Sequence, residues 1–198
     1  PGKLIWKANI NGTPASMLTA DGRLYVVTKE GSINCFSGGE GTGNQLELAS
    51  QTPESLDDNW KKAAGKLIET AGAKEGFAVV VGAGSGRLVD ELVAQSDLRV
   101  IVVEDDQDKA DKHRQRLVEA GVYGHRVAVL ASDPLNCMLP PYLANLVVGE
   151  ELPAAAHEHP AEFTQWVYGI LRPYGGTACM MLEDNQHQLL AGAVSELS

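Results

Sequence analysis

The sequence is poor in positive charge and in cysteine. Against 26 Asp and Glu it has 16 Lys and Arg, which gives the 198-residue chain a formal net charge of −10. Nucleic acids are bound by basic faces, so this balance argues against a nucleic-acid partner. The cysteines are Cys35, Cys137 and Cys179. Their odd number and wide spacing favour small core residues over disulfides or a metal site.

Long apolar runs are also missing. None approaches the length that spans a bilayer, so the sequence predicts no membrane segment. Hydrophobic residues nevertheless make up 44% of the chain. That content and length suffice for one good core.

The most informative stretch is a glycine-rich turn. The apolar run at residues 77–81 predicts a strand, and Gly82, Gly84 and Gly86 follow it directly, before a helix-like pattern. Glycines let the backbone approach a ligand where a Cβ would clash, and a helix N-terminus presents free N–H groups. This stretch predicts a site for a nucleotide-like ligand.

A second predicted strand, residues 99–104, ends in Glu104. In dinucleotide-type folds, an acid about twenty residues after the glycine turn hydrogen-bonds the ribose hydroxyls. The dinucleotide fingerprint requires a glycine where Arg87 stands. The spacing here is G-x-G-x-G, which resembles motif I of the class I S-adenosylmethionine (SAM) methyltransferases. An NAD-binding enzyme is the less favoured alternative.

Further landmarks resemble the same family, over about residues 55–185. Residues 127–133 resemble its third strand with a following acid, residues 145–150 its fourth strand, and residues 171–176 the turn before a fifth strand at 177–182. The alternation of strands and helices independently predicts a parallel sheet covered on both faces. We therefore expect an α/β, Rossmann-like, doubly wound and mainly parallel sheet, preceded by a small antiparallel β segment.

The resemblance implies a SAM site and a methyl transfer to an unidentified small-molecule or protein acceptor. The implied cofactor-binding set is Gly82, Ala83, Gly84, Gly86, Glu104, Asp105 and Asp133. In it the glycines accommodate the methionine part, Glu104 holds the ribose and Asp133 binds the adenine edge. Methyl transfer needs mainly positioning and exclusion of water. Glu150 is the candidate for a substrate-facing base.

Two positions depart from the family pattern. Val80 stands where the family usually has an acid that helps to hold the methionine amino group, and Asn145 replaces the acid that often opens the fourth strand. They favour an alternative in which the domain is a non-catalytic interaction module.

The first residues follow a different pattern. Short apolar runs at 2–6, 20–28 and 29–36 are separated by Asp-Gly and Glu-Gly turns, which predicts antiparallel hairpins. Their order resembles one repeat of the PQQ-like (quinoprotein-type) β-propeller. The resemblance implies a propeller segment and linker at residues 1–44 and a methyltransferase-like domain at 45–198. With the start at Pro1, it also implies a fragment of a longer propeller polypeptide.

The propeller resemblance leaves other expectations open. A single blade cannot form an axial quinone site, so PQQ itself is not expected here, although the parent protein could be a PQQ-type alcohol dehydrogenase-like oxidoreductase. SAM use implies the cytoplasm, whereas propellers of this type are commonly exported or periplasmic. The open edge beside the fifth strand and the incomplete blade predict coverage by the main domain or by a second copy of the chain.

Besides the helix after the glycine turn, three helices are expected after the linker. Ser55 is the predicted cap of the first, whose apolar stripe is Trp60, Ala64, Leu67, Ile68 and Ala71. The second, residues 106–120, is a charged helix with Ala110 and Leu117 inward and His113 at the surface. The third covers residues 161–171. We expect a rigid Pro-Pro-Tyr loop at 139–142, and His157 and His159 in a solvated loop.

Overall fold

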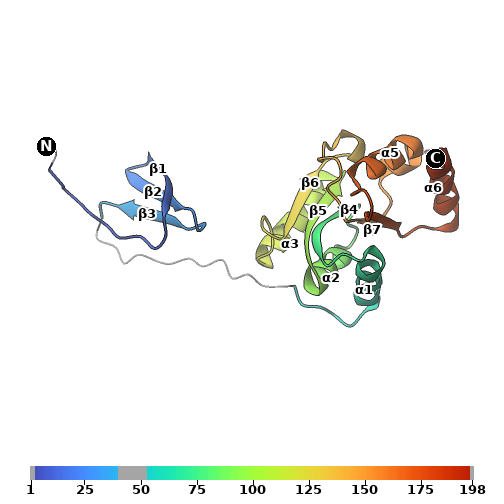
Figure 1. Cartoon of the computed structure of the whole chain (residues 1–198), viewed down its shortest axis with the longest axis horizontal. Coiled ribbons are helices and arrows are strands. Elements are labelled where there is room, and N and C mark those ends of the chain that lie inside the picture. Colours follow the sequence, from blue (N-terminus) through green and yellow to red (C-terminus); the bar gives the residue numbers. More distant parts are fainter. Residues whose placement is uncertain (1–2, 40–52, 197–198) are drawn as a thin grey trace. The chain divides into compact units, whose positions relative to one another are not determined.

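The chain forms two compact units, Pro1–Glu47 and Leu48–Ser198. The structure is a computed structural model that describes residues 3–39 and 53–196 (Figure 1). The boundary predicted between residues 44 and 45 lies outside the described residues.

The smaller unit is an antiparallel sheet of three strands. Strands β1 (Pro14–Ala20), β2 (Arg23–Thr28) and β3 (Ile33–Ser37) pair in chain order. The β2–β3 pair confirms the predicted hairpin within residues 20–36, whereas β1 was not predicted. Asp21 and Gly22 join β1 to β2 with φ of 49° and 67°, as in the turns that suit the twist of a hairpin. The strand pattern expected at 2–6 is wrong for the described residues 3–6, which form no strand.

The larger unit is built on the predicted parallel sheet of five strands. In spatial order these are β6 (Val127–Ala131), β5 (Asp97–Glu104), β4 (Glu75–Val81), β7 (Leu146–Gly149) and β8 (Thr177–Met180). The chain runs outward from β4 to β6 and then returns to the other side of β4. At such a reversal of strand order, ligands bind beyond the carboxyl ends of the strands.

Helices cover both faces of this sheet (Figure 1). One layer has α1 (Asn59–Ala71), α2 (Arg87–Gln95) and α3 (Gln107–Glu119); the other has α4 (Ala154–Glu158), α5 (Pro160–Ile170) and α6 (Asp184–Glu196). Along β4, Ala78 and Val80 join the core under the first layer, whereas Val79 and Val81 join the other core. This alternation is the strand period of two, and both faces are apolar because both are covered.

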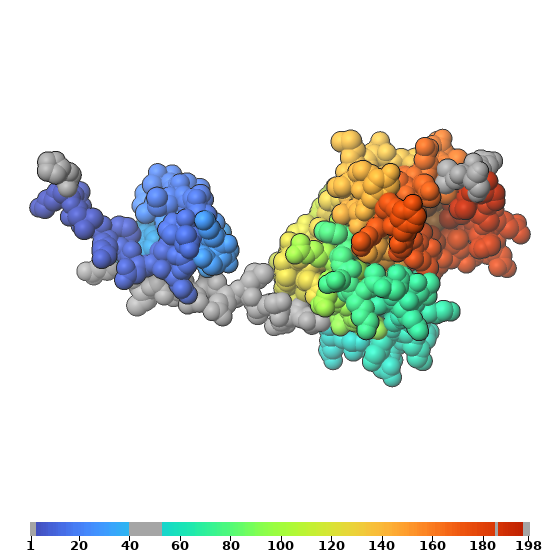
Figure 2. All heavy atoms as spheres, in the orientation of Figure 1, coloured from blue at the N-terminus to red at the C-terminus, as the bar shows by residue number. Residues whose placement is uncertain are grey.

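The second helical layer contains elements that the sequence patterns missed. In the space-filling view α6, in red, lies at the surface beside α5, in orange (Figure 2). The fifth strand ends at Met180 rather than at the predicted Leu182, and α6 follows it. A short 3-10 turn, η1 (Pro134–Asn136), follows β6.

The ends of the helices correct one prediction. Asp58, not Ser55, caps α1: its Oδ1 accepts from the backbone N–H of Lys61 at 3.0 Å. At the carboxyl end of α2, Arg126 donates from Nη2 to the carbonyl oxygens of Val93, Ser96 and Leu98.

The cysteines differ in exposure. Cys137 is buried and Cys179 is partly buried, and burial raises the pKa of both thiols. Cys35 is exposed, so its expected place in a core is wrong.

Candidate functional site

The glycine loop, residues 82–86, lies at the carboxyl end of β4, as the sequence predicts. Gly82, Gly84 and Gly86 have φ of 65°, 52° and 77°, in the left-handed region that other residues rarely adopt. The amide of Gly82 donates to the carbonyl of Val103 at 3.0 Å, and Gly86 forms the N-cap of α2. The loop therefore turns tightly over the ends of β4 and β5.

Glu104 meets this loop from the end of β5. Its Oε2 accepts from the amide of Ala83 at 3.1 Å and its Oε1 from the amide of Asp106 at 3.4 Å. The side chain is 2% exposed, and burial raises its pKa despite the two backbone donors. The structure thus joins two predicted parts of the site, whereas the neighbouring Asp105 is exposed.

Glu150, directly after β7, also reaches the loop. Its Oε2 accepts from the amide and the hydroxyl of Ser85, both at 2.8 Å, and its Oε1 accepts from the amide of Leu88 at 2.6 Å. The carboxylate therefore lies on free N–H groups at the start of α2. Its side chain faces the predicted cofactor loop.

Residues 150–151 fill the space that the glycines leave open. The amides of Glu150 and Glu151 both donate to the carbonyl of Gly82, at 3.1 and 3.2 Å. A Cβ on Gly82 would overlap the carbonyl of Glu151, and one on Gly84 would lie 2.8 Å from Oε2 of Glu150. The Glu151 carboxylate pairs with Lys109 at 2.9 Å. Because these glycines have no side chains, Glu150 and Glu151, which follow β7, can pack directly against the loop.

Asp133 follows β6 at the same edge of the sheet, where the amide of Ser132 donates to the carbonyl of Glu104 at 2.9 Å. The Asp133 carboxylate caps the η1 turn, accepting from the amide of Leu135 at 2.8 Å and from the side-chain amide of Asn136 at 3.4 Å. These contacts give Asp133 a local structural role, and its contact with an adenine edge stays a prediction.

His113 and Arg116 of α3 pack against the glycine loop at Gly86. The sequence patterns did not predict this contact. His113 is 8% exposed, so its predicted surface position is wrong. A Cβ on Gly86 would lie 3.0 Å from its ring, and Arg116 donates from Nη2 to the Gly86 carbonyl at 3.3 Å. Burial and the adjacent Arg116 lower the pKa of His113. Its spacing from Ala110 and Leu117, three and four residues, was the signal for an inward position.

Arg87, which stands where a dinucleotide fingerprint has glycine, is held in an ion-pair cluster. Its guanidinium contacts Asp58 at 3.0 Å, Asp90 at 3.5 Å and Glu91 at 2.7 Å. Glu91 is fully buried and also accepts from the Ser55 hydroxyl at 2.8 Å. Burial alone would raise the pKa of Glu91, but these donors hold it below its ordinary value. Arg87 thus stabilises the start of α2.

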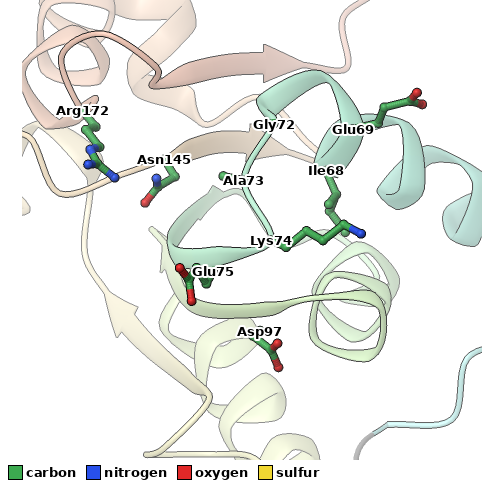
Figure 3. Close-up of a pocket in the computed structure, with 9 residues that line it drawn as sticks. All are labelled: Ile68, Glu69, Gly72, Ala73, Lys74, Glu75, Asp97, Asn145 and Arg172. Carbon is green, nitrogen blue, oxygen red and sulfur yellow. The ribbon is translucent and has the colours of Figure 1, made fainter.

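A hollow of about 600 Å³ lies at the end of the sheet where the strands begin, opposite the glycine loop (Figure 3). It is lined by Ile68, Glu69, Gly72, Ala73, Lys74, Glu75, Asp97, Asn145 and Arg172. Glu75 and Asp97 begin their strands, whereas ligands of this architecture bind at the strands' carboxyl ends. The hollow is therefore separate from the glycine-loop site.

Other features give no sign of a metal or a membrane. Residues 3–39 and 53–196 contain no group of three or more His, Cys, Asp and Glu suited to a metal ion. His157 and His159 are exposed, but the loop predicted for them is wrong at His157, which lies in α4. Within the same described ranges, no helix has both the length and the apolar character to cross a bilayer.

Solved structures share this architecture. A proposed SAM-dependent methyltransferase from Methanococcus maripaludis matches with a TM-score of 0.55 and 20% identity over 70% of this chain. A SAM-dependent O-methyltransferase from Thermotoga maritima matches with a TM-score of 0.55 and 16% identity over 91% of this chain and 69% of its own. The larger unit has the SAM-methyltransferase fold.

These similarities concern the fold, because identity is low. A proposed sarcosine dimethylglycine methyltransferase from Galdieria sulphuraria has 12% identity and a TM-score of 0.54 over 68% of this chain. The chain spans 62% of the Methanococcus protein's length and 53% of the Galdieria protein's. No family model matches the sequence, and no curated protein does.

Proposed function

We propose that the larger unit binds SAM at the glycine loop and transfers its methyl group to a small-molecule or protein acceptor. The observation that carries the proposal is the contact between Glu104 and the amide of Ala83. It brings an acid at the end of one strand onto the glycine loop of the adjacent parallel strand. In folds of this architecture, the acid hydrogen-bonds the cofactor's ribose while the glycine loop lets the backbone approach the rest of the cofactor.

The residues present fit parts of such a ligand. Each Glu104 oxygen has lone-pair capacity beyond its one backbone donor. Residues 150–151 take the space beside Gly82 and Gly84, so the methionine part would lie there only after these residues move away. Asp133 follows β6, the strand next to β5, at the same end of the sheet, and in this proposal it binds the adenine edge. SAM supplies an electrophilic methyl group when bound. The protein's own contribution is orientation and exclusion of water, so no obligatory base is required.

Ligand binding provides the direct test. S-adenosylhomocysteine should raise the melting temperature of the full chain, because a ligand that binds only the native state stabilises it. NAD should leave the melting temperature unchanged, since Arg87 occupies the position of the third fingerprint glycine. Stabilisation by NAD alone would contradict the cofactor assignment.

Glu104→Gln tests the predicted ribose contact. The variant should bind S-adenosylhomocysteine about tenfold more weakly, because a charge-assisted hydrogen bond is lost. Its melting temperature should fall only slightly: the amide NH2 cannot accept from one of the two backbone donors, whereas the buried charge is removed. The matched control is Glu75→Gln, an equal charge change at the exposed start of β4. Equal affinity in Glu104→Gln and the native chain would exclude Glu104 from the site.

A non-catalytic interaction module is the second candidate. Residues 150–151 cover the glycine loop, and Val80 is fully buried in the core instead of presenting an acid. Asn145 accepts from the amide of Phe77 at 3.2 Å, a structural contact at the start of β4. Silence with S-adenosylhomocysteine, NAD and PQQ alike in calorimetry would favour this candidate.

The context of the domain is likewise a proposal. Residues 1–44 would belong to a PQQ-like propeller polypeptide, and a second copy of the chain would cover the free edge of β8. Light scattering of the full chain measures the second-copy proposal directly. Fractionation of cells would decide between a cytoplasmic protein, expected for SAM use, and an exported one.

A further inference from the structure

We infer that Glu150 is an internal competitor of the ligand: its carboxylate occupies the start of α2 and must leave before a ligand can lie on the glycine loop. The inference rests on the proposed function and adds a regulatory contact to it. Glu150 would then lower affinity, rather than act as the substrate-facing base that its sequence position suggests.

The contacts of Glu150 are those of a bound anion. Three donors from the loop and the first turn of α2 converge on its two oxygens, at 2.6 to 2.8 Å. One of these donors is the amide of Leu88 in the first turn of α2, which a helix start leaves unpaired within the helix, and another is the amide of Ser85, just before the N-cap Gly86. An acidic ligand group at this loop would need the same donors. The ligand and the Glu150 side chain are therefore mutually exclusive.

The backbone around Glu150 strengthens this closure. The amides of Glu150 and Glu151 hold the carbonyl of Gly82, and the Glu151 carboxylate pairs with Lys109 on α3. Gly149 permits the close approach, because a Cβ there would lie 2.5 Å from the carbonyl of Val81. The segment 149–151 is thus fastened to β4, to the loop and to α3.

The contact of Glu150 with the loop lowers ligand affinity by reducing the fraction of molecules that can bind. If only a fraction of molecules has Glu150 displaced, the apparent dissociation constant rises in inverse proportion to that fraction. Removing the carboxylate frees the donors and increases the competent fraction. Affinity for S-adenosylhomocysteine should then increase, which is the opposite of what the loss of a ligand-binding residue would cause.

The experiment compares the full chain with Glu150→Ala and Glu150→Gln, using S-adenosylhomocysteine in isothermal titration. We expect Glu150→Ala to bind S-adenosylhomocysteine about tenfold more tightly. The closed state loses the hydrogen bonds of the carboxylate, and the net contribution of one hydrogen bond corresponds to a change of roughly tenfold in the dissociation constant. Glu150→Gln keeps the size of the side chain and removes its charge, and should show an intermediate gain. The control is Glu158→Gln, an equal charge change at the exposed end of α4, with native affinity expected.

Hydrogen exchange without ligand tests the contact itself. In Glu150→Ala the amides of Ser85 and Leu88 should exchange faster by about tenfold, while amides in β5 keep their protection.

The outcomes separate the two proposals. Weaker or unchanged affinity in both Glu150 variants overturns the competition but leaves the SAM site standing, because the ligand still binds. If neither the native chain nor either variant binds S-adenosylhomocysteine, both proposals fail, whatever the exchange rates.

Discussion

His113 is a buried titratable side chain against the glycine loop, and its charge state should affect stability. Its pKa in the folded chain is lowered from the ordinary value of 6.5, first by burial and then by Arg116. Because the unfolded chain binds the proton more readily, stability is fully present above about pH 6.5 and is lost as the pH falls toward the folded-state pKa. Each unit of lowering corresponds to about 1.4 kcal/mol.

The variant His113→Gln should flatten this dependence. Between pH 7.5 and about 5, the native chain should lose more free energy of unfolding than the variant in urea denaturation. His125, which is exposed, is the matched control: His125→Gln should leave the slope unchanged. Parallel curves for the native chain and His113→Gln would show that His113 takes no part.

At the scale of the element, two helices offer a comparison of caps. Asp58 and Asp106 each accept from the amide three residues on, at 3.0 Å, and both cap a helix of 13 residues. Only Asp58 also pairs with Arg87, which in turn holds the buried Glu91. We therefore expect Asp58→Ala to lower the melting temperature more than Asp106→Ala.

The order of those two losses is the measurement, made by thermal melts of both variants under one condition. Equal losses would mean that the Arg87 cluster adds nothing to the cap. A larger loss in Asp106→Ala would contradict the proposed importance of the cluster.

Most helices and strands, but not all of them, were predictable from patterns in the sequence. The parallel strands and α1, α3 and α5 followed from apolar runs and helical spacing, because each buries a continuous face. The missed α6 begins at Asp184 among polar residues, and its place depends on packing against α5. Ser55 has the right chemistry for a cap, but the chain enters the helix at Asn59 and uses Ser55 on Glu91 instead.

The candidate site was predictable only in part, for the same reason. Strand ends and glycines fix the backbone around Gly82 and Glu104. The side-chain contacts of Glu150 and Asp133 depend on loops whose path no periodicity encodes.

At the scale of the whole molecule, the larger unit should fold without the smaller one. Both buried clusters consist of residues from 64 onward, and the buried residues of 3–39 are only Val26 and Thr28. Residues 48–198 alone should melt cooperatively within about 2–4 °C of the full chain, a change of about 1 kcal/mol or less. Residues 1–47 alone should show no cooperative melt, since so small a sheet is at best marginally stable. A much lower melting temperature for residues 48–198 would reveal a dependence on the smaller unit.

The two ends of α2 have a further consequence. The aligned peptide dipoles of a helix favour an anion at its start and a cation at its end, and here Glu150 and Arg126 supply both. A ligand carboxylate that displaces Glu150 exchanges one anion for another, so the electrostatic balance of the helix is the same before and after. The affinity for such a ligand should therefore vary little with ionic strength, although the chain carries a net charge of −10.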